Sequence, residues 1–120
     1  MRNHAFGALL SCAALFAASN ANAADVTGVA FVHGTGSQTN AYNDYWQPTM
    51  VNNVRNGLAN PANYVVINCD FNQYMWDSRA AGCLAGQLAS FISARGITRL
   101  IVITRSNGGN VIRWIMSNPT

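Results

Sequence analysis

Ser106 is the residue whose type and surroundings point most directly to chemistry. It lies in residues 103–109, Ile-Thr-Arg-Ser-Asn-Gly-Gly, after the apolar run at residues 100–103 and before a helix-like segment. A serine at a sharp strand-to-helix turn has its hydroxyl held clear of the backbone. The helix N-terminus then points at the negative charge that develops on a substrate oxygen. The pattern predicts a nucleophilic serine.

A second glycine-punctuated loop, His-Gly-Thr-Gly at residues 33–36, follows the apolar run at residues 26–32. Gly34 and Gly36 allow the backbone to approach a substrate with no Cβ in the way. The same loop could suggest a dinucleotide site, but Thr39 stands where that motif has its third glycine. We therefore expect no cofactor.

The first 23 residues have the pattern of a secretory signal peptide. Arg2 precedes an apolar run at residues 5–18, and residues 21–23 are Ala-Asn-Ala, so cleavage is expected after Ala23 and the protein is expected to be exported. A membrane anchor is the alternative, but the run is shorter than the roughly 20 residues that a span needs. A lipoprotein anchored at Cys12 is a second alternative. After cleavage we expect no stable membrane span.

Charge and length limit the remaining classes of function. The chain has a formal net charge of +3, and its charged residues are arginines and four aspartates, with no lysine and no glutamate. The arginines are scattered rather than clustered, which argues against a nucleic-acid partner. Residues 24–120 are enough for one small domain.

Two cysteines, Cys69 and Cys83, remain after removal of the leader. In an exported chain they suggest one disulfide, with two free buried thiols as the alternative. Neither cysteine has a metal-ligand partner at useful spacing, so no metal site is expected.

Strand and helix patterns alternate along residues 24–120, which predicts an α/β fold with a parallel sheet and right-handed crossovers. Gly96 is expected to end the second helix. Three parallel strands alone would leave two apolar edges unpaired. We therefore expect residues 24–120 to be the N-terminal part of a larger domain. The predicted strands are residues 26–32, 64–67 (buried on both faces) and 99–104, and the predicted helices are residues 44–58, 78–95 and 108–117.

The His-Gly loop at residues 33–36 and the serine turn at residues 104–109, in this order, resemble the α/β-hydrolase family, especially its secreted lipase-like and esterase-like members. The resemblance implies a partial α/β-hydrolase fold of three parallel strands with flanking helices, from which the C-terminal half of the sheet is missing. It places the first predicted strand between the other two, so that both loops meet at the C-terminal edge of the sheet.

The resemblance also implies acyl transfer on a small-molecule or lipid ester. Ser106 would be the nucleophile, and the backbone N–H groups of Thr35 and Asn107 would hold the oxyanion. Gly108 and its neighbour Gly109 would allow the new helix to approach the sheet closely.

The sequence departs from the family pattern at three points. Thr104 replaces the first glycine of Gly-x-Ser-x-Gly, and Arg105 replaces the histidine common in lipases. No Asp, Glu or His follows Ser106, whereas the family order is serine, acid, histidine. His33 could serve as the base, but its context favours a structural role in the oxyanion loop. We therefore expect little or no esterase activity from these 120 residues alone.

Three further interpretations remain beside the hydrolase. The chain could be a non-catalytic secreted binding module built on the same half-sheet. Asp70 and Asp77 could form a carboxylate pair, although an ordinary strand end and a helix cap explain them better. Five aromatic residues could line an acyl-binding wall or simply pack the first helix and its loop. These are Tyr42, Tyr45, Trp46, Tyr74 and Trp76.

Overall fold

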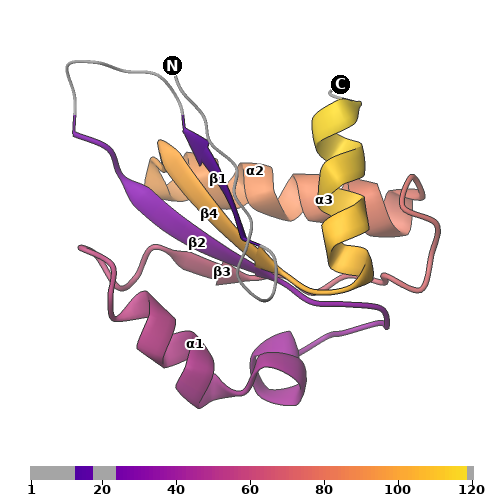
Figure 1. Cartoon of the computed structure of the whole chain (residues 1–120), viewed down its shortest axis with the longest axis horizontal. Coiled ribbons are helices and arrows are strands. Elements are labelled where there is room, and N and C mark those ends of the chain that lie inside the picture. Colours follow the sequence, from indigo (N-terminus) through magenta and orange to yellow (C-terminus); the bar gives the residue numbers. More distant parts are fainter. Residues whose placement is uncertain (1–12, 18–23, 119–120) are drawn as a thin grey trace.

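The computed structural model describes residues 13–17 and 24–118, and its centre is a four-stranded sheet (Figure 1). The strands are β1 (Ala13–Ala17), β2 (Thr27–Val32), β3 (Tyr64–Val66) and β4 (Arg99–Thr104), in the order β1-β4-β2-β3. β2 pairs in parallel with both β3 and β4, whereas β1 is antiparallel to β4. The predicted three-strand parallel sheet is confirmed, with the first of its strands in the middle as expected.

Helices cover both faces of the sheet, and alternate residues of β2 and β4 point to opposite sides. α1 (Pro48–Arg55) lies on one face, and α2 (Cys83–Arg95) and α3 (Asn107–Ser117) lie on the other. Because side chains alternate along a strand, each central strand contributes to two separate cores. Ala30, Val32, Leu100 and Val102 pack toward α2 and α3, and Val29, Phe31, Ile101 and Ile103 pack toward α1.

The first helix differs from the prediction of one continuous helix over residues 44–58. A π-helix at Tyr42–Trp46 is followed by α1, which begins at Pro48. Between them Gln47 has φ 75° and ψ 117°, outside the helical region. Proline lacks an N–H and disfavours the helical conformation in the residue before it, so the break falls at this point.

The strand predicted at residues 64–67 is shorter and less buried than expected. β3 covers only Tyr64–Val66, all three residues are half-buried, and the strand lies at the edge of the sheet. The guanidinium of Arg55 lies over the Tyr64 ring, 4.3 Å from its centroid. The continuous β-branched run predicted burial on both faces, but a strand at the edge of the sheet keeps part of its surface exposed.

The other predicted elements lie close to their expected positions. A π-helix at Ser78–Gly82 leads into α2, and the carboxylate of Asp77 accepts a hydrogen bond from the Arg79 N–H as an N-cap. Gly96 ends α2 in the left-handed conformation, with φ 63°. α3 begins at Asn107, one residue before the predicted start, and ends at Ser117.

The predicted leader lies mostly outside the described residues, including Arg2, Cys12 and the cleavage motif. Its segment Ala13–Ala17 forms β1, with Ala13 opposite Ile103 and Ala17 opposite Arg99. The edge of β4 that was expected to be unpaired is therefore paired here. Cleavage after Ala23 remains a prediction, and it would remove this strand. None of the helices in the described residues has the length and apolarity to cross a membrane.

Candidate functional site

Ser106 lies at the junction of β4 and α3 in a backbone conformation that side-chain-bearing residues rarely adopt. Its φ is 51° and its ψ is −129°, and it serves as the N-cap residue of α3 without a side-chain capping bond. Such a conformation costs about 1–3 kcal/mol and persists only where the surrounding structure enforces it. The residue is also exposed. A sharp strand-to-helix turn thus presents Ser106 to solvent, and we call residues 104–109 the elbow.

Glycines allow the loop after β2 and the start of α3 to pack against each other. A Cβ on Gly108 would collide with the carbonyl oxygen of His33 and lie 3.0 Å from a Val32 methyl carbon. A Cβ on Gly34 would lie 3.0 Å from the Ser106 Cβ. Gly34 thus gives room to Ser106 and to the Tyr45 hydroxyl, and the room it was expected to give a substrate stays a prediction.

Thr104, which replaces the family's first glycine, fits beneath the start of α3. It is buried, and its Oγ1 would be 2.9 Å from a Cβ on Gly108. The absence of a side chain on Gly108 therefore makes space for the threonine. Its hydroxyl oxygen makes no hydrogen bond to any described residue.

The two predicted loops lie side by side at the C-terminal ends of adjacent parallel strands. Val32, the last residue of β2, is in register with Thr104, the last residue of β4. Beyond the strands, the Thr35 Oγ1 lies 3.4 Å from the Ser106 Oγ, and both residues are exposed. The structure therefore brings the predicted nucleophile next to the predicted oxyanion loop.

The two predicted oxyanion donors have backbone amides that are not used inside the fold. At the start of α3, Gly108 N–H donates to the Arg105 carbonyl and Gly109 N–H donates to that of Ser106. The N–H groups of Thr35 and Asn107 donate to no acceptor within residues 13–17 and 24–118. Two unpaired N–H groups flanking an exposed hydroxyl are what an oxyanion hole requires.

His33 has a structural role. It is fully buried, its Nε2 accepts a hydrogen bond from the Cys69 N–H at 3.1 Å, and its Nδ1 lies 2.8 Å from the Gly34 carbonyl oxygen. An Nε2 that accepts requires the proton on Nδ1, so the ring is neutral. Burial is the main cause that lowers the pKa of His33, although the contact with the Gly34 carbonyl opposes that shift. Both ring nitrogens are occupied, so His33 is not free to take a proton from Ser106.

Cys69 and Cys83 are joined by a disulfide, with an S–S distance of 2.09 Å and a Cα–Cα distance of 6.0 Å. The bridge connects the segment after β3 to the first residue of α2. The disulfide therefore anchors Cys69, the residue whose backbone N–H donates to His33 Nε2.

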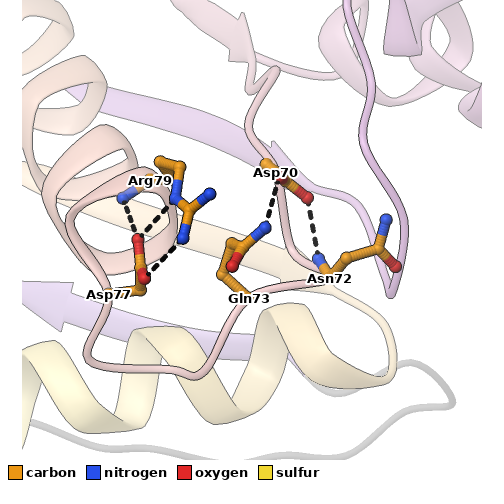
Figure 2. Close-up of polar contacts among 5 residues, drawn as sticks. All are labelled: Asp70, Asn72, Gln73, Asp77 and Arg79. Carbon is orange, nitrogen blue, oxygen red and sulfur yellow. Dashed lines mark hydrogen bonds and ion pairs between the residues drawn. The ribbon is translucent and has the colours of Figure 1, made fainter.

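The two aspartates do not form a carboxylate pair (Figure 2). Asp70 accepts hydrogen bonds from the Asn72 N–H and the Gln73 side chain, and the Gln73 contact is the main reason that its pKa is lowered. Asp77 binds the Arg79 guanidinium and backbone N–H, which lowers the pKa of Asp77 to about 2. Each carboxylate is thus engaged in its own local loop contact.

The five aromatic residues divide between the cores, the site and the surface. Trp46 is buried against Phe31. Tyr74 and Trp76 stack on each other with centroids 5.0 Å apart, both exposed. The Tyr45 hydroxyl would be 2.8 Å from a Cβ on Gly34, the glycine that packs against Ser106. The sequence analysis named Tyr45 only as one of five aromatic residues that could line an acyl-binding wall, and nothing in the sequence distinguished it from the other four.

An open groove of about 780 Å³ lies elsewhere, between α2 and β3. Its lining includes Val65, Gln87, Phe91 and Arg95, and of the predicted site residues only Cys83. The Cys83 sulfur is held in the disulfide and is not a free thiol, and no residue of the serine turn lines this groove. Within the described part of the chain, no three His, Cys, Asp or Glu side chains are grouped as they would be around a metal ion.

Comparison of the chain with protein-family models, with curated proteins and with solved structures gave no match.

Proposed function

We propose that this chain carries the nucleophile and oxyanion-binding half of a serine hydrolase that acts on carboxylic esters, built on a partial α/β-hydrolase fold. The observation that carries the proposal is the strained, exposed conformation of Ser106 at the strand-to-helix turn. A fold that tolerates this strain at an exposed serine uses it to present the hydroxyl. The resemblance in sequence and the adjacency of the His-Gly loop support the same conclusion.

In the proposed reaction the Ser106 Oγ attacks the ester carbonyl carbon and loses its proton to a base. The C=O π electrons move onto the carbonyl oxygen, and the N–H groups of Thr35 and Asn107 stabilise that oxyanion. When the carbonyl re-forms, the alkoxide leaves and takes up a proton, and an acyl ester remains on Ser106. Water then releases the acid by the same steps.

The base of this reaction is not among the described residues near Ser106, because His33 has both nitrogens occupied. A serine hydroxyl without a base is a weak nucleophile, so the chain as given is expected to have little or no activity. This gap also supports a second candidate, a secreted binding module that does no chemistry.

Covalent labelling with a fluorophosphonate probe tests the proposal. The purified chain is incubated with the probe alone and with increasing imidazole, which can replace a missing histidine base. We expect slow labelling that accelerates with imidazole and that maps to Ser106. Ser106→Ala is the matched control, because it removes the nucleophile without changing the turn, and it should not label.

Labelling that is equal in the native chain and in Ser106→Ala would contradict the proposal. Absence of labelling at every imidazole concentration would favour the binding module. Fast labelling without imidazole would show that a base is present after all, and would require His33 or another group of the chain to be reassigned.

A further inference from the structure

Residues 68–71, Asn-Cys-Asp-Phe, follow β3 and lie between α2 and the two loops of the site; we call them the strap. α2 holds the strap firmly at its start. The Cys69–Cys83 disulfide joins the two covalently, the Gln87 side-chain amide donates to the Asn68 carbonyl at 2.8 Å, and its oxygen accepts from the Asn68 N–H at 3.2 Å. Its start is thereby fixed to the longest helix described.

The other side of the strap holds the oxyanion loop through main-chain contacts. Cys69 N–H donates to His33 Nε2, and Gln38 N–H donates to the Cys69 carbonyl at 3.1 Å. Phe71 N–H donates to the Gly36 carbonyl at 2.8 Å, and the Phe71 ring lies against the His33 ring with centroids 4.5 Å apart. These contacts enclose Thr35 between fixed points on either side.

The strap also reaches the elbow. The Asn107 side-chain Nδ2 donates to the Phe71 carbonyl at 2.9 Å, while its Oδ1 accepts from Asn110 Nδ2 at 3.2 Å. The contact with the Phe71 carbonyl ties the Asn107 side-chain amide to the strap. Phe71 thus binds the oxyanion loop with its N–H and the residue after the nucleophile with its carbonyl.

We propose that the strap sets the spacing of the two oxyanion donors, with the Asn107 side chain and the Cys69–Cys83 disulfide as positioning groups. The proposal rests on the function proposed above. An oxyanion is stabilised only when its donors are held to within about 0.5 Å of the productive geometry. Thr35 and Ser106 are exposed and 71 residues apart in sequence, so a third element has to fix their separation.

The strained backbone of Ser106 gives a second reason for such an element. A conformation of this kind relaxes unless contacts on both sides enforce it. One contact is the close packing of Gly108 against the His33 carbonyl. The other is the hydrogen bond from the Asn107 side chain to the Phe71 carbonyl. A strap that is loosened should therefore change the electrostatic environment at Ser106 before it changes the fold.

The experiment uses the full chain with Ser106→Cys and Cys12→Ser, so that one free thiol reports on the oxyanion site. The thiol pKa is obtained from the pH dependence of iodoacetamide alkylation, because only the thiolate reacts. Donors aimed at a negative charge lower this pKa below the ordinary value of about 8.5. Arg105 acts on the thiol in every variant and so does not affect the comparison.

Asn107→Leu is added to this background, and Asn110→Leu is the matched control. Both remove an amide from the same helix, but only Asn107 touches the strap. We expect Asn107→Leu to raise the thiol pKa by about half a unit or more, and Asn110→Leu to leave it unchanged. The double change Cys69→Ala and Cys83→Ala should raise it in the same direction, provided that circular dichroism shows a folded chain.

Amide hydrogen exchange at Gln38 and Phe71 reports on the strap without any reference to catalysis. Asn107→Leu should speed exchange at these two amides by roughly tenfold relative to Asn110→Leu, with strand residues 29–31 as the unchanged reference. Equal exchange in the two variants would overturn the proposal, and so would faster exchange with no change in thiol pKa. If both readouts respond but fluorophosphonate never labels Ser106, the hydrolase proposal fails and the positioning role stands.

Discussion

The elbow around Ser106 and the loop from Asp70 to Arg79 are stabilised in opposite ways. At the elbow, glycines without a side chain let backbone groups pack closely, and the packed segments are about 70 residues apart in sequence. In the loop, the contacts in Figure 2 join residues no more than three positions apart and involve polar side chains that are exposed or half-buried. At the elbow, an added side chain at Gly34 or Gly108 would collide with its neighbours. In the loop, water can take the place of a polar side chain that is removed.

This difference determines how each region should respond to change. A collision with a buried carbonyl cannot be relieved without moving a strand or a helix. An exposed ion pair competes with water and salt, so little is lost when it is removed. The elbow is therefore expected to be sensitive to a single added methyl group, and the loop to be nearly indifferent to loss of a charge.

The largest effect is expected for Gly108→Ala. Its Cβ would collide with the His33 carbonyl oxygen, so α3 must shift away from the oxyanion loop, at a loss of about 3 kcal/mol in the free energy of unfolding. Gly109→Ala is the matched control, because its Cβ would meet Thr104 only at 3.7 Å, an ordinary contact. Urea unfolding of both variants measures the difference, and equal stabilities would show that the approach of α3 is not tight.

The next effect is the response of stability to pH through His33. Its pKa is lowered in the folded protein, mainly by burial, so the unfolded chain binds a proton more readily. Stability is therefore full above about pH 6.5 and falls as the pH drops toward the lower pKa of the folded state, by up to about 1.4 kcal/mol per pH unit. Asp77 has a pKa of about 2 in the folded state, so it stays ionised and paired with Arg79 throughout the pH range 4.5–7.5.

Urea unfolding between pH 4.5 and pH 7.5 checks the assignment. His33→Gln serves as the control, because it is less stable but lacks the group that titrates. Its stability should change little over this range, and a slope as steep as that of the native chain would assign the effect elsewhere.

A smaller effect follows from the backbone of Ser106. Glycine adopts a φ of 51° without the steric cost that a Cβ brings, so Ser106→Gly should be more stable than Ser106→Ala by up to about 1 kcal/mol. Both variants lack the hydroxyl, so the comparison isolates the backbone. Thermal unfolding measures it, and a less stable glycine variant would show that the turn carries no strain.

The sequence predicted the elements that depend on local signals and missed those that depend on neighbours. β4 and the end of α2 at Gly96 were found because an apolar run and a glycine stop mark them within a few residues. The break at Gln47 was missed although Pro48 was visible, because the helical spacing of apolar residues continues through it. The burial of β3 was overestimated because a continuous β-branched run was taken to indicate a strand covered on both faces, whereas burial depends on the elements that lie beside it.

The candidate site was predictable in its motifs but not in its supports. Ser106 and the His-Gly loop stood out by residue type and order. The contacts from Phe71 to Gly36 and Asn107 could not be foreseen, because they pass through main-chain atoms that every residue has. The position of the Tyr45 hydroxyl depends on the π-helix at Tyr42–Trp46, which no spacing rule indicated.

The smallest effect is expected in the loop, from Asp77. Asp77→Ala removes a helix cap and an exposed ion pair, and should lower the Tm by at most about 4 °C. Asp77→Asn keeps an oxygen that can accept a hydrogen bond from the Arg79 N–H, so it should recover most of this loss.

Because the pKa of Asp77 is lowered to about 2, its contribution to stability is present above the ordinary carboxylate pKa and is lost as the pH falls toward 2. Differential scanning calorimetry at low and high salt separates the two roles, because salt screens the ion pair and leaves the cap. A loss from Asp77→Ala as large as that from Gly108→Ala would remove the distinction between the two regions.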